Sequence, residues 1–185
     1  MVTRPEGEAV PGHTEIVRTL LDAGAVRFGD FTLTSGEKSD IYIDVKRAWT
    51  DPKHLDVLAR ALSERVGSVD RLAGMELGAV PLVVAVALRT GHPYVVLRKA
   101  TKEHGTRQAF EGDISPGLKV LLIEDVTTTG GSTLRSIEIV RGAGGVVDRA
   151  LVVVDREAGA TARLAAIGVR VEPLVTMSEL RGARP

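Results

Sequence analysis

The sequence predicts an α/β fold with a central parallel sheet that is covered by helices on both faces. Apolar runs such as VLLI at 120–123 and LVVV at 151–154 lack the alternation of a half-exposed strand, so both faces of these strands should be buried. Segments with helical spacing separate the runs, and this order is typical of strands joined by helical crossovers. The 185 residues are enough for one ordinary domain, so we expect residues 1–185 to form a single domain.

The N-terminal part should contain a helix, a hairpin and a second helix. Apolar residues recur at helical spacing in the first of these segments, and Gly24 follows it as a C-cap. Asp51 is an N-cap candidate, and the proline after it favours a helix start. The expected elements are a helix at 14–23, strands at 31–34 and 40–44 around a Ser-Gly turn, and a helix from Pro52 to about Val66.

From residue 72 onward, strands and helices follow one another along the chain. The expected strands are 72–75, 94–97, 120–123, 150–154 and 169–175, and the expected helices are 80–89, 132–141 and 158–166. The long interruption at 99–117 is polar and rich in Lys, Glu and Gly. Loops of this length in compact domains are uncommon and are often lids or binding loops, although a surface insertion is the alternative.

Composition and charge exclude several classes of protein. Lys plus Arg equals Asp plus Glu, at 24 each, so no overall field favours nucleic acid or a membrane surface, and any anion site must be local. The absence of cysteine excludes disulfides and thiolate zinc sites. The N-terminus lacks the apolar run of a signal peptide, and the longest apolar stretch, 80–88, is too short to span a bilayer. We therefore expect a cytoplasmic protein without nucleic-acid or membrane partners.

The segment LLIEDVTTTGGST at 121–133 is the strongest chemical signal in the sequence. An apolar strand leads into Glu124 and Asp125, and a turn of small residues then opens an amphipathic helix. Ligands of open parallel sheets bind beyond the carboxyl ends of the strands, and the amides and hydroxyls of such a turn suit an anion. Carboxylates accept hydrogen bonds from vicinal hydroxyls, so the whole segment favours a sugar phosphate. The alternative is an acidic strand end followed by an ordinary helix cap.

This segment resembles the motif with which type I phosphoribosyltransferases bind phosphoribosyl pyrophosphate (PRPP). The resemblance implies the type I phosphoribosyltransferase fold, a central parallel sheet flanked by helices, with a small N-terminal hood at about residues 13–45 and a flexible lid loop at about residues 99–117. It also implies that PRPP is a substrate. The residues implied to bind it are Arg98, Lys99, Lys102, His104, Glu124, Asp125, Val126, Thr127, Thr128, Thr129, Gly130, Gly131 and Ser132.

Three further segments resemble the orotate phosphoribosyltransferases in particular. They are RFGDFTLTSGEKSDIYID at 27–44, similar to the hood of that family, LRKATKEHG at 97–105, similar to its catalytic lid, and VVVDREAGA at 152–160. The family transfers ribose 5-phosphate from PRPP to orotate, giving orotidine 5'-monophosphate and pyrophosphate in pyrimidine (UMP) biosynthesis. The resemblance implies that Lys102, His104 and Asp125 are catalytic, and that Thr128 and Arg156 bind orotate. A guanidinium matches the orotate carboxylate, whereas a surface ion pair of Arg156 with Asp155 or Glu157 is the alternative.

The chain departs from the family pattern at three positions. Arg27 stands where many members carry a lysine, and Glu124 stands where many carry an aspartate. The segment GMELGAVPL at 74–82 resembles the loop that binds pyrophosphate, but Gly78 replaces a lysine that many relatives have there. We therefore expect this loop to use its backbone amides.

The resemblance also implies a cofactor and an assembly. Mg²⁺ should arrive bound to PRPP or pyrophosphate oxygens, so no direct protein ligand of the metal is expected. A homodimer with the lid shared across subunits is implied. Two alternatives remain, a phosphoribosyltransferase for another base and a PRPP-sensing regulator without catalysis. Arg156 and the hood argue against the first, and the lack of a helix-turn-helix segment or a basic excess argues against the second.

Overall fold

The structure is a computed structural model that describes residues 9–32, 36, 38–99 and 109–184. Its elements, in chain order, are α1 (His13–Asp22), β1 (Val26–Thr32), β2 (Lys38–Ile43), α2 (Lys46–Trp49), α3 (Pro52–Ser63), β3 (Arg71–Met75), α4 (Val80–Thr90), β4 (Tyr94–Leu97), β5 (Phe110–Glu111), β6 (Val120–Thr127), α5 (Gly131–Gly142), β7 (Arg149–Asp155), α6 (Ala160–Ala165), β8 (Arg170–Thr176) and α7 (Met177–Gly182). Within the described residues, no helix is both long enough and apolar enough to cross a membrane.

The expected parallel sheet is confirmed. Six strands lie in the order β5-β4-β3-β6-β7-β8, and every neighbouring pair is parallel except β4 and β5. Successive residues of a strand point to opposite faces, so Leu121 and Ile123 join one buried cluster while Leu122 joins the other. The continuous apolar runs of the sequence are therefore explained by burial on both faces.

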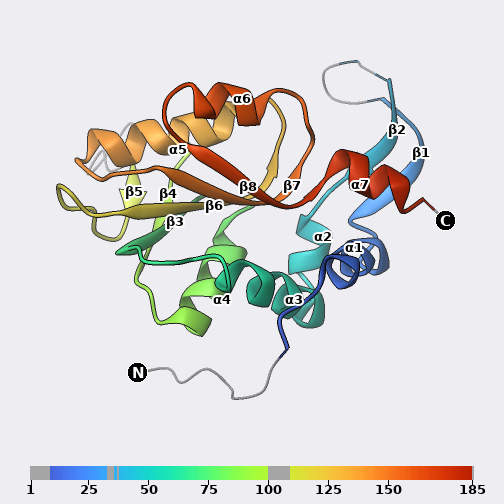
Figure 1. Ribbon diagram of the computed structural model, residues 1–185, viewed down its shortest axis with the longest axis horizontal. Coiled ribbons are helices and arrows are strands. Elements are labelled where there is room, and N and C mark those ends of the chain that lie inside the picture. Colours follow the sequence, from blue (N-terminus) through green and yellow to red (C-terminus); the bar gives the residue numbers. More distant parts are fainter. Residues whose placement is uncertain (1–8, 33–35, 37, 100–108, 185) are drawn as a thin grey trace.

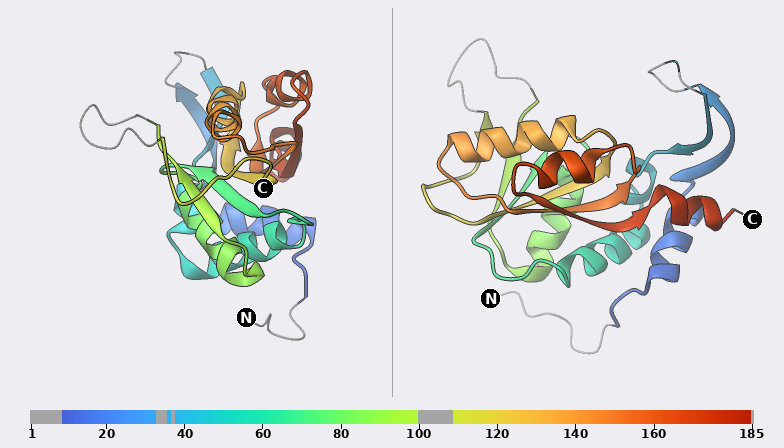
Figure 2. Two further views of the ribbon diagram at one scale, coloured as in Figure 1. Left: turned by 90° about the vertical axis from the view of Figure 1, so that its left-hand side faces the viewer. Right: turned by 45° about the horizontal axis from the view of Figure 1, so that its top comes forward.

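Helices cover both faces of this sheet. Helices α1, α3 and α4 lie on one side, and α5 and α6 lie on the other (Figures 1 and 2). The hairpin of β1 and β2 pairs outside the main sheet, and α7 lies at the same end of the molecule as this hairpin (Figure 1). That end is also the end toward which the parallel strands β7 and β8 run. The hood is thus placed near the carboxyl edge of the sheet, where a ligand is expected.

Local sequence explains the starts of two helices. The Asp51 side chain accepts a hydrogen bond from the backbone N–H of Lys53 at 2.8 Å, and Pro52 occupies the first position of α3. Helix α7 begins with a capping box, in which the Thr176 hydroxyl and the Glu179 carboxylate bond the backbone of each other's residue. The Asp51 cap was expected from the sequence, whereas α7 was not.

The structure corrects several expected boundaries. Strand β6 continues four residues past the expected end at Ile123, because its pairing with β7 runs on to Thr127 and Asp155. Strand β1 begins at Val26, not at residue 31. Elements α2, β5 and α7 were not expected. The first two contain only four and two residues, so they carry no periodic pattern, and β5 places a strand inside the segment expected to be a loop.

Candidate active site

The turns that follow β3, β6 and β7 lie at one edge of the sheet, because these strands are parallel. Main-chain hydrogen bonds join two of the turns directly. The N–H of Arg156 donates to the carbonyl of Thr127 at 2.9 Å, and the N–H of Ala160 donates to the carbonyl of Thr128 at 3.2 Å. The predicted phosphate turn and the predicted orotate residue are therefore neighbours, although 28 positions separate Thr128 from Arg156 in the sequence.

The predicted phosphate turn, residues 128–131, joins β6 to α5. Gly130 has φ 77°, and a Cβ atom there would lie 3.3 Å from the Cα of Ala160, so the turn packs closely on α6. No side chain caps α5, which leaves the N–H groups of its first turn available to an anion. The Thr127 hydroxyl is buried without a hydrogen-bond partner in the described structure. A ligand oxygen at this position would satisfy it.

Glu124 and Asp125 lie on opposite faces of β6, because adjacent strand residues alternate. The Glu124 side chain faces α5, where the Ser136 hydroxyl lies 3.4 Å from its Oε1. Only 4% of Glu124 is exposed. Burial, together with the neighbouring charge of Asp125, raises the pKa of the Glu124 carboxyl to about 8. The Glu124 carboxyl is therefore mostly protonated at neutral pH.

The Asp125 side chain points to the other face and meets the turn after β3. Its Oδ1 accepts a hydrogen bond from the Val126 N–H at 2.8 Å. A Cβ atom on Gly78 would lie 2.3 Å from Asp125 Oδ2, so a larger residue at 78 would require the carboxylate to move. The glycine that departs from the family pattern thus allows the backbone to approach Asp125 in this arrangement.

The turn after β3 is also bonded to the end of β4. The N–H of Glu76 donates to the carbonyl of Leu97 at 2.8 Å, and the Glu76 carboxylate accepts a hydrogen bond from the N–H of Lys99 at 3.0 Å. The peptide bond between Glu76 and Leu77 is cis. These contacts fix the turn at the start of the predicted lid.

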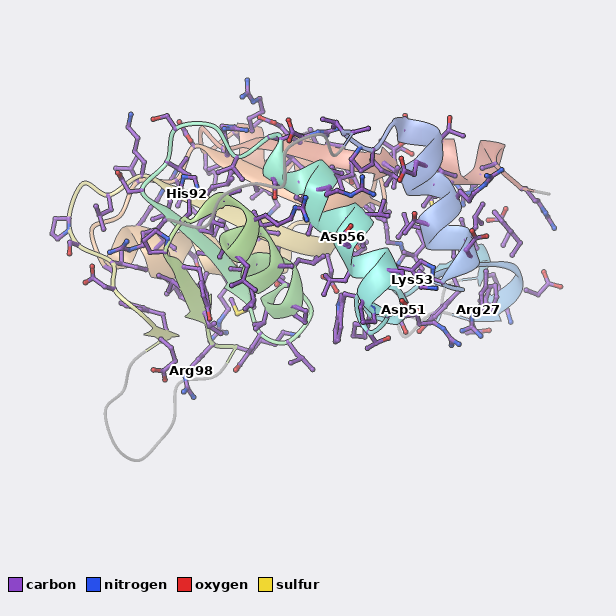
Figure 3. All side chains as sticks on the ribbon, turned by 90° about the horizontal axis from the view of Figure 1, so that it is seen from below. Arg27, Asp51, Lys53, Asp56, His92 and Arg98 are labelled. Atoms are coloured by element: carbon purple, nitrogen blue, oxygen red, sulfur yellow. The ribbon has the colours of Figure 1, made fainter. Side chains whose placement is uncertain are left out.

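Of the four cationic residues predicted in the lid, the structure describes Arg98 and Lys99. The Arg98 guanidinium pairs with the Glu111 carboxylate of β5, and Figure 3 shows Arg98 at the end of β4. Lys99 is exposed, and its charge lowers the pKa of Glu124, although less than burial raises it. Lys102 and His104 lie outside the described residues, so their predicted roles remain predictions.

Arg156 is held by its backbone N–H, and among the described residues no hydrogen bond or ion pair engages its side chain. The Asp155 carboxylate accepts hydrogen bonds from the Glu157 N–H and the Thr161 hydroxyl, each at 2.8 Å. The Glu157 carboxylate instead accepts from the N–H and hydroxyl of Ser178, at 2.7 and 2.5 Å. The surface ion pair with Asp155 or Glu157 that was the alternative for Arg156 is not formed in the described structure, and the Arg156 Nε is buried without a hydrogen-bond partner there.

The hood contributes an arginine that lies over two neighbouring aromatic rings. The Arg27 guanidinium lies 4.9 Å from the ring centre of Tyr42 and 5.8 Å from that of Phe31. The hairpin is tied to α7 by an ion pair between Arg181 and Asp40 at 3.1 Å. Neither this contact nor the bond between Glu157 and Ser178 could be expected from the sequence. Only the capping-box pattern Thr176 to Glu179 could have revealed that a helix lies there.

Comparison with known proteins identifies the family. Residues 49–169 match the model of the phosphoribosyl transferase domain. The curated orotate phosphoribosyltransferase of Methanosarcina acetivorans is 48% identical over 168 residues, which cover 90% of each chain. The crystal structure of orotate phosphoribosyltransferase from Aeropyrum pernix superposes with a TM-score of 0.81 and 36% identity, over 91% of this chain and 97% of the other.

A further similar structure is that of a complex with PRPP. The orotate phosphoribosyltransferase of Mycobacterium tuberculosis, crystallised in complex with PRPP, is 29% identical and superposes with a TM-score of 0.76, over 92% of this chain and 99% of the other. The agreement of sequence and structure extends over about nine-tenths of the chain. The chain therefore belongs to the orotate phosphoribosyltransferases, within the phosphoribosyl transferase domain family.

Proposed function

We propose that this chain transfers ribose 5-phosphate from PRPP to N1 of orotate, with release of pyrophosphate, at the site formed by the turns after β3, β6 and β7. The observation that carries the proposal is the bond from the Arg156 N–H to the Thr127 carbonyl, which joins a phosphate turn to a buried, unpartnered guanidinium nitrogen. A phosphate and a carboxylate could therefore be bound side by side. The PRPP complex of the Mycobacterium tuberculosis relative supports PRPP as the donor.

The 5'-phosphate of PRPP would be bound by the turn after β6. The amides of residues 127–131 and the hydroxyls of Thr127, Thr128 and Thr129 supply donors, and Ser132 adds one on the first turn of α5. Asp125 would accept hydrogen bonds from ribose hydroxyls and stabilise the positive charge that develops at C1' in the transition state. Protonated Glu124 would donate a hydrogen bond, so we assign the negative charge near the ribose to Asp125 alone.

Orotate would be bound by Arg156 and Thr128. A guanidinium and a carboxylate form paired hydrogen bonds, and this charge-assisted pairing would orient the ring so that N1 faces C1'. The main-chain bond of Ala160 to Thr128 supports the proposal, because it holds the two residues in one unit. Catalysis would then depend on alignment of two substrates and on exclusion of water, without a covalent intermediate on the protein.

The lid would neutralise the leaving pyrophosphate. We assign this role to Lys102 and His104, with Arg98 and Lys99 at the base of the lid. Arg98 is paired with Glu111, so Lys99 is the better placed of the two to reach a ligand. Closure of a positively charged segment over the diphosphate would lower the barrier, because negative charge grows there as the bond to C1' breaks.

Mg²⁺ would enter this site with PRPP. Among the described residues, no group of three or more His, Cys, Asp or Glu side chains is arranged to hold a metal ion. The site therefore suits an ion coordinated mainly by diphosphate oxygens and water, as Mg²⁺ commonly is. Bound in this way, Mg²⁺ would stabilise the negative charge of the pyrophosphate.

We further propose that the chain acts as one domain in a cytoplasmic homodimer that shares its lids. Leu77 and Leu88 are 63% and 64% exposed, and Tyr94 is 42% exposed, all three on or beside α4. Exposed apolar side chains of this size favour a protein contact, and Leu77 lies in the turn that meets Asp125. A second subunit on this face would lie next to the active site.

The experiment that tests the function is a steady-state assay of orotate consumption with PRPP and Mg²⁺. We expect orotidine 5'-monophosphate and pyrophosphate in equal amounts, and no product when adenine or hypoxanthine replaces orotate. Product with a purine would assign the chain to another base. Binding of PRPP without turnover of any base would instead support a PRPP-sensing regulator.

A further inference from the structure

Lys46 lies at the edge of the candidate site, although no motif drew attention to it. It is the first residue of α2 and follows directly on β2. Its Nζ lies 2.8 Å from Asp44 Oδ1, and 53% of its side chain is exposed, so it can reach solvent or a ligand. Figure 1 shows α2 between the hairpin of the hood and α3.

The packing of α2 places Lys46 on the Asp125 side of the sheet. Val45 and Ala48 are fully buried and belong to the same cluster as Leu121 and Ile123 of β6. Asp125 faces the same side of β6 as Ile123, because the two are two residues apart in one strand. Lys46 and Asp125 are therefore on one face of the sheet, whereas Glu124 is on the other.

The electrostatics agree with this placement. Pairing with the Asp44 side chain is the main cause that raises the pKa of Lys46. Burial, the second-largest cause, lowers it, and the negative charges of Asp44 and Asp125 each raise it by less. The ammonium is thus close enough to Asp125 to be stabilised by it, and it stays charged across the neutral range.

The neighbouring turn supplies no cation to this corner of the site. Its residues are Glu76, Leu77, Gly78 and Ala79, none of which carries a positive charge, and Gly78 lies directly against the Asp125 carboxylate. On the far side, Arg98 is engaged by Glu111, and Lys99 acts on Glu124. The charge of Asp125, by contrast, is among the causes that raise the pKa of Lys46.

We propose that Lys46 binds the diphosphate end of PRPP, at the point where Asp125 meets the turn after β3. The proposal rests on the proposed function, because it takes Asp125 as the ribose-binding acid. The diphosphate is attached to the ribose carbon next to the hydroxyls that Asp125 would hold, so it must leave the ribose near this corner. Lys46 would turn from Asp44 toward a phosphoryl oxygen and supply the positive charge that Gly78 cannot carry.

The test compares Lys46→Ala with Lys53→Ala. Lys53 is an exposed lysine seven residues away, on the first turn of α3, and its structural role is the backbone bond to Asp51, which alanine keeps (Figure 3). Calorimetric titration with PRPP and with pyrophosphate, each with Mg²⁺, should give at least a tenfold weaker Kd for Lys46→Ala. The PRPP KM should rise in parallel, and the orotate KM should change little. Lys53→Ala should match the parent, and Lys46→Arg should recover most of the affinity.

Three results would overturn the proposal. They are an unchanged PRPP Kd in folded Lys46→Ala, an equal loss in Lys53→Ala, and a larger effect on orotate than on PRPP. Thermal unfolding of each variant excludes a general loss of structure, and a Lys46→Arg protein that folds but binds PRPP as weakly as Lys46→Ala would also contradict a role of the charge. Because the titrations need no turnover, they remain decisive if the parent binds PRPP but does not consume orotate, a result that would reject only the proposed function.

Discussion

The turns of the strand-end side of the candidate site, residues 76–79, 124–131 and 155–160, are joined to each other or to β4 by main-chain bonds, whereas the hairpin of the hood is joined to α7 by side chains. The turns of the strand-end side bond each other through Arg156 to Thr127 and Ala160 to Thr128. The hairpin of the hood is tied to α7 by an exposed ion pair, and its Arg27 packs over two neighbouring rings.

Main-chain bonds and side-chain contacts depend on residue identity to different degrees. Main-chain bonds survive most substitutions, so changes on the strand-end side should remove chemistry without moving the backbone. Side-chain contacts on an exposed surface are weaker, because solvent and salt screen them. The strand-end side should therefore show large losses of activity at constant stability, and the hood should tolerate the loss of a single contact.

The largest loss of turnover is expected from Asp125→Asn. The substitution keeps the shape of the side chain and the bond from the Val126 N–H, but removes the negative charge that would face C1'. We expect kcat to fall on the order of 100-fold, as when one aligned electrostatic group is removed, with unfolding unchanged. Glu138→Gln, an exposed acid on α5, is the control. Parent-like turnover of the asparagine variant would remove Asp125 from the site.

Arg156→Ala should act on one substrate only. A charge-assisted hydrogen bond contributes about 1.5–3 kcal/mol, which corresponds to a roughly 10- to 150-fold rise in the orotate KM. The PRPP KM should stay nearly constant, because Arg156 bonds the phosphate turn through its backbone N–H, which alanine retains. Steady-state kinetics with each substrate varied in turn measure the change in the orotate KM and the change in the PRPP KM separately. Equal losses for both substrates would mean that Arg156 supports the whole turn and does not bind the base.

Glu124 should make stability depend on pH. Its folded pKa of about 8 lies above its ordinary value of 4.5, so the folded state keeps a proton that the unfolded chain has lost between these limits. The free energy of unfolding should therefore fall as pH rises through this window, by at most about 1.4 kcal/mol per pH unit from this group. Glu124→Gln should remove that part of the slope in urea unfolding from pH 5 to pH 8. An equally steep slope in the variant would assign it to another group.

The fold could be predicted from the sequence wherever burial of a strand or helix produces a pattern of apolar residues. Apolar runs marked every strand of the sheet except β5, whose two residues are defined only by pairing with β4. The length of β6 could not be predicted, because its last residues are polar and are held as a strand by β7. Once the strands are taken as parallel, the turns after β3, β6 and β7 must lie at the same edge of the sheet.

Motif residues of the site were predicted from the sequence, but their differences were not. Glu124 and Asp125 read as one acidic pair, yet the alternation of β6 buries the first and leaves the second beside Gly78. Lys46 carried no signal, since its position depends on how α2 packs against strands far away in the sequence. The sequence indicates which residue types follow one another along the chain. The pKa of a side chain and the identity of its neighbours depend on tertiary contacts, which the sequence does not show directly.

Arg181→Ala should give the smallest effect and tests the hood directly. Both side chains of its ion pair with Asp40 are about half exposed, at 50% and 53%, and exposed pairs contribute about 0–1 kcal/mol. We therefore expect a small decrease in the free energy of unfolding, and a change in kcat/KM of no more than about fivefold, the factor that corresponds to 1 kcal/mol. A double-mutant cycle with Asp40→Ala isolates the pair from other effects of either change. A coupling energy well above 1 kcal/mol, or a loss of activity as large as that of Arg156→Ala, would mean that this one contact positions the hairpin over the site, because the remaining contacts of the hood could not then hold it.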